Sequence, residues 1–438
     1  MGAIYESWGR YPSLPQTARR LDWRQASLPV TSTNEETYLP FGNGRSYGDS
    51  CLSSNGVLLD TRGLDRFMTF NPETGHLRCE AGVLLADILA LVVTQGWFLP
   101  VTPGTKYVTL GGAIANDVHG KNHHQAGTFG CHVRCFELLR SDGQRLICSP
   151  TQNAEWFRAT IGGLGLTGII VWAEIALQRI AHPAIYLETI RFPNLTAFFE
   201  LSASSDRDYQ YTVAWIDCLA KGPKLGRGVF MRGNQATALC PVQPPLPKRR
   251  LHIPLVPPLS LVNGLSLRLF NTLYYYKHSQ SITRSIVNYE PFFYPLDVIG
   301  SWNRIYGPRG FLQYQCVVPS VDGQLVIRDI LQRIASAGSG SFLAVLKVFG
   351  DKPSPGLLSF PRPGVTLALD FPFQGNKTLH LLAQLDGLVA AAGGAVYPAK
   401  DARLSAAHFR QFFPDWKDLV AFKDPRFMSS FWRRVTQD

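Results

Sequence analysis

The chain has 438 residues, of which 45% are hydrophobic and only 17% are charged. This composition excludes a largely disordered protein and leaves room for two folded domains. The 43 Lys and Arg outnumber the 32 Asp and Glu, for a net charge of +11, which favours anionic partners such as phosphates, nucleic acid or a membrane face. No long basic run or recognised motif supports nucleic acid, so no nucleic-acid partner is expected.

The cysteines and the apolar segments bear on the compartment. None of the 8 cysteines forms a CxxC pair, and the closest spacing joins Cys131 and Cys135. A disulfide framework or zinc site is not expected, and a reducing compartment fits best. The sequence predicts neither a secretory signal nor a transmembrane helix.

The first part of the chain mixes short apolar runs with helical stretches. In chain order, strands are predicted over 56–60, 67–70 and 76–82, a helix over 83–95, a hairpin over 135–149, a helix over 153–161 and a strand over 168–177. Asp142-Gly143 marks the turn of the hairpin. This order differs from the strict βαβ alternation of a doubly wound sheet.

The character of the chain changes after about residue 180. Strands are predicted over 186–192, 211–218, 311–318, 341–350 and 365–371, and helices over 195–205, 321–337 and 377–392. Strands that face helices indicate an antiparallel sheet covered on one side, so the predicted fold class is α+β.

Residues 241–258 hold seven prolines and the basic run Lys248–Arg250. Proline at this density blocks helices and central strands, so an exposed loop is predicted. The mixture of apolar and basic residues leaves contact with a membrane surface as the alternative to a solvated connector.

The first motif with chemical content is FGNGRSYGD, over 41–49. Its glycines, Gly42, Gly44 and Gly48, let backbone N–H groups converge on an anion. Arg45 and Ser46 add side-chain donors. A plain glycine-rich turn is the alternative interpretation.

The second motif spans residues 103–124 and begins with Pro103-Gly104-Thr105. Its small residues would let a flat ligand lie against the backbone: Gly111, Gly112, Ala113 and Ala115. The donors that follow suit a phosphate or a flavin edge: His119, Lys121, Asn122, His123 and His124. No acidic residue or thiol stands nearby at ligand spacing, so no metal is expected, and a surface loop with incidental histidines is the remaining alternative.

A third glycine motif, over Gly163–Gly168, matches GxGxxG. A dinucleotide fingerprint follows a strand and opens a helix. Here a predicted helix precedes the motif and a strand follows it, so a Rossmann site is rejected.

Together these segments resemble the FAD-binding fold of the vanillyl-alcohol oxidase and p-cresol methylhydroxylase superfamily. Within it, HGKNHH, AWIDCLAKGPKLGRG, YPLDVIGSWNRIYGPRGFLQYQ and YPAKDAR are similar to the oxidase components of decaprenylphosphoryl-β-D-ribose 2′-epimerases. The resemblance implies a two-domain flavoprotein. Its FAD-binding domain would comprise 1–180 and 395–438, and an antiparallel-sheet substrate domain would comprise 181–394.

The family pattern also implies the cofactor site. The residues expected to contact FAD are Gly42, Asn43, Gly44, Arg45, Ser46, Tyr47, Pro103, Gly104, Thr105, Gly111, Gly112, Ala115, Asp117, His119, Gly120, Asn122, His123, Gly165, Gly168, Ile170 and Tyr397. Tyr47 stands where many superfamily members carry a histidine that bonds covalently to the flavin. Non-covalent FAD is therefore expected.

The residues expected to bind substrate by motif match are Trp215, Gln313, Gln315, Lys347, Phe349 and Lys400. Lys347 and Lys400 would face an anionic substrate, and a lysine of lowered pKa can accept a hydroxyl proton. The residues proposed for catalysis are Lys400, Tyr47 and His119. For either lysine taken alone, a surface charge is the ordinary alternative.

The resemblance implies oxidation of the 2′-hydroxyl of a polyprenylphosphoryl-β-D-ribose to a ketone, with hydride passing to FAD and the proton to a base. A separate NAD(P)H-dependent short-chain reductase would complete the conversion to the arabinose epimer, and a quinone or O₂ would reoxidise the flavin. The chain would work in the cytoplasm, peripherally at the inner face of the plasma membrane. The alternatives are an aldonolactone or other sugar-alcohol oxidase, and a flavin- or sugar-lipid-binding subunit without turnover.

Two positions depart from mycobacterial relatives. Thr366 and Ala368 stand where those proteins have Asn and Cys. The oxidation does not require a thiol, so activity is still expected, whereas substrate contacts are expected to differ.

Overall fold

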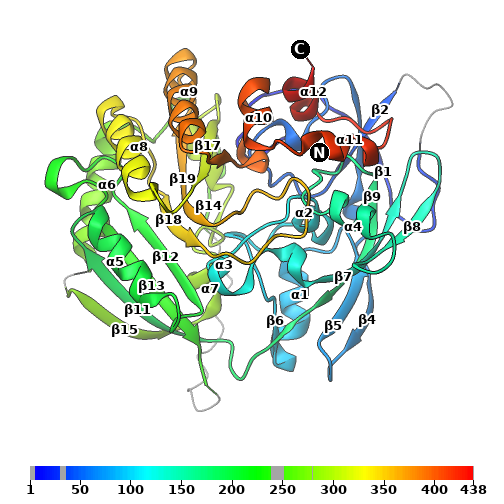
Figure 1. Ribbon diagram of the computed structural model, residues 1–438, viewed down its shortest axis with the longest axis horizontal. Coiled ribbons are helices and arrows are strands. Elements are labelled where there is room, and N and C mark those ends of the chain that lie inside the picture. Colours follow the sequence, from blue (N-terminus) through cyan, green and yellow to red (C-terminus); the bar gives the residue numbers. More distant parts are fainter. Residues whose placement is uncertain (1–4, 30–35, 238–250, 279, 438) are drawn as a thin grey trace.

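The computed structural model describes residues 5–29, 36–237, 251–278 and 280–437. Figure 1 shows one half of the molecule built around a large sheet with α5, α8 and α9, and another half that holds the smaller sheets and the C-terminal helices. The α+β class predicted from the sequence is confirmed.

Two small sheets form the first half. The strands β1 (Thr17–Arg20), β3 (Gly56–Asp60) and β2 (Thr37–Phe41) pair in parallel in that order. The five-stranded antiparallel sheet has the order β4 (Phe67–Asn71), β5 (His76–Glu80), β9 (Ile169–Ala176), β7 (Val133–Leu139) and β8 (Arg145–Cys148). Its helices are α1 (Leu85–Val92), α2 (Leu110–Ala115) and α4 (Ala154–Thr160). The hairpin of β7 and β8 is confirmed, and Gly143 takes a φ of 85° at its turn.

The second half is an eight-stranded antiparallel sheet. Its order is β15 (Ile282–Val287), β11 (Ile185–Phe192), β13 (Gly228–Gln235), β12 (Tyr211–Ile216), β18 (Ala344–Phe349), β19 (Gly364–Pro372), β17 (Phe311–Val318) and β20 (Ala395–Val396). The helices α5 (Leu195–Ser205), α8 (Gly323–Ala337) and α9 (Asn376–Ala391) pack on it, which confirms the three predicted helices. The buried side chains Ile330, Leu331 and Ile334 of α8 belong to this core.

The predicted domain boundary at 394 precedes β20, which pairs with β17. Beyond it the chain returns to the first half, where Tyr38 N–H donates to the Arg426 carbonyl at 2.7 Å and Met428 N–H donates to the Tyr38 carbonyl at 2.8 Å. The division into 1–180, 181–394 and 395–438 stays a prediction.

The sequence did not predict α6 (Gly264–Lys277), β13 or β15. The shorter elements are β6 (Trp97–Phe98), α3 (His123–Ala126), β10 (Gln178–Arg179), β14 (Leu251–His252), α7 (Tyr289–Phe293), β16 (Ile299–Gly300), α10 (Ala406–Phe412), α11 (Trp416–Phe422) and α12 (Ser430–Thr436). Of the proline-rich segment 241–258, residues 241–250 lie outside the described residues, and Leu251 and Leu255 are exposed. Across the described ranges, no helix combines the length and apolar character needed to span a bilayer.

Candidate active site

A cavity of about 510 Å³ lies where the two halves meet. Its wall combines the loop after β2, the segment around α2, the strands β17, β18 and β19, and the turn after β20. This volume lies within the usual range for cofactor and substrate pockets. The glycine motifs and both predicted lysines therefore share one cavity.

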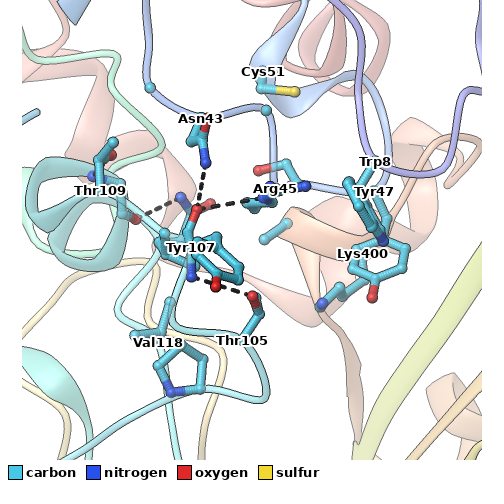
Figure 2. Close-up of a pocket in the computed structure, with 18 of the residues that line it drawn as sticks. Trp8, Asn43, Arg45, Tyr47, Cys51, Thr105, Tyr107, Thr109, Val118 and Lys400 are labelled. Carbon is cyan, nitrogen blue, oxygen red and sulfur yellow. Dashed lines mark hydrogen bonds between the residues drawn. The ribbon is translucent and has the colours of Figure 1, made fainter. Parts of the chain in front are cut away.

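The loop after β2 presents backbone donors at this cavity. Gly44 takes a φ of 59°, a left-handed conformation that favours glycine. Within the described ranges, no group accepts a hydrogen bond from the backbone N–H groups of 43–46. Asn43 Nδ2 and Arg45 Nε instead fix the loop by donating to the Tyr107 carbonyl at 2.8 and 3.3 Å (Figure 2). Free N–H groups beside a fixed guanidinium suit an anionic group such as a pyrophosphate.

The helix α2 brings bare backbone to the opposite wall. Thr109 caps it, because its Oγ1 accepts from Gly112 N–H at 3.1 Å. A Cβ on Gly111 would stand 3.0 Å from the Ala81 side chain, and a Cβ on Gly112 would stand 2.9 Å from Thr109 Oγ1. Gly111 and Gly112 both line the cavity, so this wall is bare backbone on which a ring system can lie.

The turn after β20 carries Lys400 to the cavity. Tyr47 N–H donates to the Ala399 carbonyl at 2.9 Å, which ties this turn to the glycine loop. Lys400 Nζ lies 3.7 Å from the centre of the Tyr47 ring; Figure 2 shows the two side chains together. Asp370, on the neighbouring strand β19, accepts from Gln313 Nε2 at 2.6 Å and from the Tyr306 hydroxyl at 3.3 Å.

Burial changes the protonation of the cavity lysines. It lowers the pKa of Lys400 to about 7, against the opposing attraction of Asp370, and Lys347 lowers it further. Burial also lowers the pKa of Lys347 to about 8, and its Nζ donates to the Gly120 carbonyl at 3.3 Å. Near neutral pH, Lys400 can therefore accept a proton while Lys347 stays a cation.

His119 lies between the flat wall and the large sheet. Its Nε2 is 2.9 Å from Gln315 Nε2, and the same amide donates to Thr366 Oγ1 at 3.3 Å. Its Nδ1 is buried without a partner among the described residues. Burial, with Lys347 nearby, holds the pKa of His119 well below its usual range, so this imidazole is neutral.

Comparison with known proteins assigns the family. Residues 24–149 match a family described as an FAD binding domain. The decaprenylphosphoryl-β-D-ribose oxidase of Mycolicibacterium smegmatis is 36% identical over 98% of this chain and 96% of its own length. The chain belongs to this oxidase family.

Other relatives are similar in sequence over different lengths of this chain. An uncharacterized protein in the mprA 5′ region of Streptomyces coelicolor is 33% identical over 81% of this chain and 100% of its own length. The L-gulonolactone oxidase of Bos taurus is 30% identical over 44% of this chain and 43% of its own length. Membership of the oxidase family rests on a match that spans both halves of the molecule.

The chain is thus an oxidoreductase whose cofactor is FAD, and the cavity fits that group. The N–H groups of 43–46 would hold its pyrophosphate, and the wall formed by Gly111 and Gly112 would hold its ring system. Bound FAD supplies the two-electron oxidant that the side chains of the cavity lack. Tyr47 offers no imidazole for a covalent link, and non-covalent binding stays a prediction.

Most residues predicted for the site line the cavity. From the cofactor set these are Gly42, Asn43, Gly44, Arg45, Ser46, Tyr47, Pro103, Gly104, Thr105, Gly111, Gly112, Ala115, His119, Gly165, Gly168, Ile170 and Tyr397, and from the substrate set Gln313, Gln315, Lys347 and Lys400. Thr366 and Ala368, the two departures from mycobacterial relatives, also line it. The individual roles of these residues stay predictions.

The structure places the other predicted residues outside the lining: Asp117, Gly120, Asn122, His123, Trp215 and Phe349. Two of them are held by hydrogen bonds within the fold. Asp117 accepts from Gly130 N–H and from the Ser359 hydroxyl, and Asn122 Nδ2 donates to the Pro100 carbonyl at 2.8 Å.

Phe349 and Trp215 pack against other aromatic rings. The Phe349 ring lies against the rings of His119 and His123, at 4.9 and 4.4 Å between centres. Trp215 turns to the unpredicted helix α6, where its ring centre is 4.6 Å from that of Tyr274. Trp215 thus packs on α6 and does not line the cavity.

Sequence reasoning missed several lining residues, among them Trp8, Cys51, Tyr107, Thr109, Asp297, Trp302 and Val345. Asp297 and Trp302 lie in the family-like segment YPLDVIGSWNRIYGPRGFLQYQ, from which only the two glutamines were selected. The seven cysteines of the described part are free, and that part holds no cluster of three residues suited to a metal.

A bulkier residue at Gly42 is expected to weaken FAD binding. A Cβ there would stand 2.5 Å from Thr109 Oγ1, the cap of α2. The displaced loop would lose at least one hydrogen bond to the charged pyrophosphate. Gly42→Val should therefore raise the Kd for FAD by at least about 10-fold. Gly387→Ala is the control, since a Cβ at Gly387 would meet nothing within 4 Å. Flavin fluorescence titration gives both constants. An unchanged Kd for Gly42→Val would contradict the placement of FAD against the loop after β2.

Proposed function

We propose that the protein oxidises the 2′-hydroxyl of a polyprenylphosphoryl-β-D-ribose to the 2′-ketone. The observation that carries the proposal is the shared cavity: Lys400 and Lys347 line the same space as the glycine loop and α2. Two lysines of different protonation suit a substrate that carries both a hydroxyl and a phosphate. The similarity to the mycobacterial oxidase along nearly the whole chain supports the same substrate class.

In this proposal Lys400 accepts the hydroxyl proton. Its pKa of about 7 makes the neutral amine available at physiological pH. Tyr47 and the Asp370–Gln313 pair hold the ammonium that forms, because the Tyr47 ring face and the Asp370 carboxylate both attract a cation.

Lys347 would attract the substrate phosphate. Its side chain rises from β18 into the cavity and keeps its proton up to a pKa of about 8. Gln315 and Thr366, joined by a hydrogen bond of 3.3 Å, would orient the sugar between the two lysines. With the base Lys400 at one end of the sugar and the cation Lys347 at the other, only one hydroxyl of the sugar would face the base.

The wider reaction sequence is also part of this proposal. A separate NAD(P)H-dependent short-chain reductase would reduce the ketone to the arabinose epimer, which feeds cell-envelope glycan synthesis. A quinone or O₂ would reoxidise the flavin. The protein would act in the cytoplasm, peripherally at the inner face of the plasma membrane, because a lipid-linked sugar is met at a bilayer.

Anaerobic mixing tests the proposed substrate. A short-chain polyprenylphosphoryl ribose is expected to bleach the flavin absorbance within one turnover, whereas free aldonolactones are not. Preferential bleaching by a lactone would establish the lactone-oxidase alternative, for which the bovine relative provides the precedent. A flavin that stays oxidised with both, although the phosphoribose binds, would identify a binding subunit without turnover.

A further inference from the structure

The surface around α6 is apolar where a protein surface is ordinarily polar. Eight residues that are 55% to 80% exposed form what we term the apolar face: Leu251, Leu255, Leu259, Leu261, Leu265, Leu269, Leu273 and Tyr276. Figure 1 shows α6 at the edge of the molecule beside α8, on the opposite side from the C-terminal helices. All eight come from one stretch of chain, 251–276, and a large exposed apolar surface marks an interaction site.

The helix α6 is held with these leucines outward. Leu265, Leu269 and Leu273 follow one another at intervals of four residues and so share one side of the helix. The opposite side is anchored, since Asn271 Nδ2 donates to buried Asp217 at 2.8 Å and Tyr274 packs on Trp215. Because the inner side is fixed, α6 cannot turn its leucines into the core. A helix whose outer side faces water would carry polar residues on that side instead of leucines.

The charged residues of the chain segment that bears the apolar face have one sign. No Asp or Glu occurs from residue 218 to residue 289. Arg268 and Lys277 of α6 are exposed beside the leucines. An apolar stripe flanked by basic residues, with no acidic neighbour in sequence, is typical of a helix that lies in the headgroup region of an anionic bilayer.

One end of the apolar face is joined to a segment that lines the cavity. The strand β14, which bears Leu251, pairs in parallel with β16. Ser301 Oγ lies 3.2 Å from His252 Nε2, and Leu261 N–H donates to the Ile305 carbonyl at 2.8 Å. The cavity is lined by 299–302, immediately behind these contacts. A bilayer on the apolar face would therefore contact a segment that is hydrogen-bonded to the cavity lining.

We propose that the apolar face docks the protein on an anionic phospholipid bilayer and so presents the cavity to a sugar carried by a membrane lipid. This inference rests on the proposed function for the identity of the substrate. The leucines would enter the acyl boundary, while Arg268 and Lys277 would contact lipid phosphates. Docking adds affinity for lipid-borne substrate without any new contact to its sugar.

Flotation of the full-length holoenzyme with vesicles tests the surface. The vesicles contain phosphatidylcholine with roughly one-third phosphatidylglycerol, an anionic content that attracts basic surfaces. Replacement of Leu265, Leu269 and Leu273 together by Gln, a good helix former, is expected to lower vesicle binding by at least about 10-fold. The matched control replaces Val321, Leu325 and Val420 by Gln, since these residues are also exposed but lie outside the apolar face. Wild-type binding by the triple leucine variant would overturn the inference.

Two further readouts separate this inference from the proposed function. With a water-soluble short-chain phosphoribose, the leucine variant should bleach its flavin at the wild-type rate, because none of the three leucines lines the cavity. For the wild-type protein, bleaching by that substrate without vesicle binding would overturn the docking surface alone. Vesicle binding without bleaching by any phosphoribose would overturn the proposed function alone. A wild-type dimer that the leucine replacements dissociate would show that a second copy covers the face, and would also overturn membrane docking.

Discussion

Replacement of Lys400 by Met is expected to abolish most substrate oxidation while the protein keeps its fold and its FAD. Lys400 lies beside Tyr47 in the cavity, and loss of a positioned general base costs about 10²- to 10⁴-fold in rate. Lys400→Arg should not restore activity, because a guanidinium does not release its proton in a protein. The single-turnover rate of anaerobic flavin bleaching measures the effect.

The pH dependence gives the same prediction a second test. The neutral amine is the active form, so the rate at saturating substrate should rise as pH passes upward through about 7, the pKa of Lys400. Loss of the Lys347 cation above about 8 should raise KM instead. A bleaching rate that is flat from acid to alkaline pH would exclude Lys400 as the base.

Lys423→Met provides the control for these measurements. Burial also lowers the pKa of Lys423, and its Nζ donates to the Asp424 carbonyl at 2.9 Å, but Lys423 does not line the cavity. The variant should bleach at the wild-type rate. If Lys423→Met and Lys400→Met lost the same activity, the loss would reflect protein stability rather than proton transfer.

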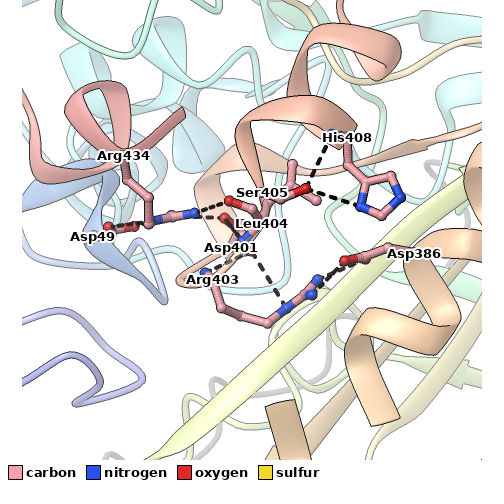
Figure 3. A network of polar contacts seen from close by, with 8 residues as sticks. All are labelled: Asp49, Asp386, Asp401, Arg403, Leu404, Ser405, His408 and Arg434. Atoms are coloured by element: carbon pink, nitrogen blue, oxygen red, sulfur yellow. Dashed lines mark hydrogen bonds and ion pairs between the residues drawn. The ribbon is translucent and has the colours of Figure 1, made fainter. Parts of the chain in front are cut away.

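The second large effect is expected on stability, from the ion-pair network that Figure 3 shows. Arg434 of α12 reaches Asp49 at 2.7 Å and Asp401 at 2.9 Å, and Arg403 pairs with buried Asp386. The arginines hold the pKa of Asp401 below its usual range against the effect of burial. The network thus fixes the residue that directly follows Lys400.

Arg434→Met would leave two buried carboxylates without their shared partner. We expect a loss of about 3 kcal/mol in the free energy of unfolding, near the lower limit for a broken buried pair, because Arg434 is 27% exposed. Asp49→Asn should cost less in the Arg434→Met background than in the wild type, since the two side chains interact. Urea denaturation measures all four proteins. Arg433→Met, one residue away, is the control, and equal losses from Arg433→Met and Arg434→Met would contradict the role of the network.

The sequence correctly predicted the helices that pack on the large sheet. Its prediction of the residues that line the cavity was less complete. The helices α5, α8 and α9 have apolar residues on one face, which a periodic pattern reveals. The helix α6 has apolar residues on its outer side as well as on its inner side, so no single apolar face identifies it. Because α6 was not predicted, nothing in the sequence indicated that the Trp215 ring packs against Tyr274 of that helix.

The cavity itself depends on contacts that local sequence does not encode. The glycine motifs were recognisable because they concentrate donors and small residues within a few positions. Asp297 and Trp302 reach the cavity only through the packing of segments distant in sequence, and no spacing rule brings them next to Gly44 or Lys347. Likewise, strand periodicity fixes the side of a sheet on which Phe349 lies, but not how far along the strand the cavity extends.

The cavity wall contains both Trp8 and Lys400, so it closes only when the last segment of the chain packs on the first. During synthesis from the N-terminus, the eight-stranded sheet can begin to pair before α12 has emerged from the ribosome, whereas the FAD site cannot. Contacts between segments so far apart in sequence form slowly. FAD that binds the finished cavity removes folded protein from the folding equilibrium and thereby stabilises it. We therefore expect a larger supply of flavin to raise the fraction of this chain that stays folded.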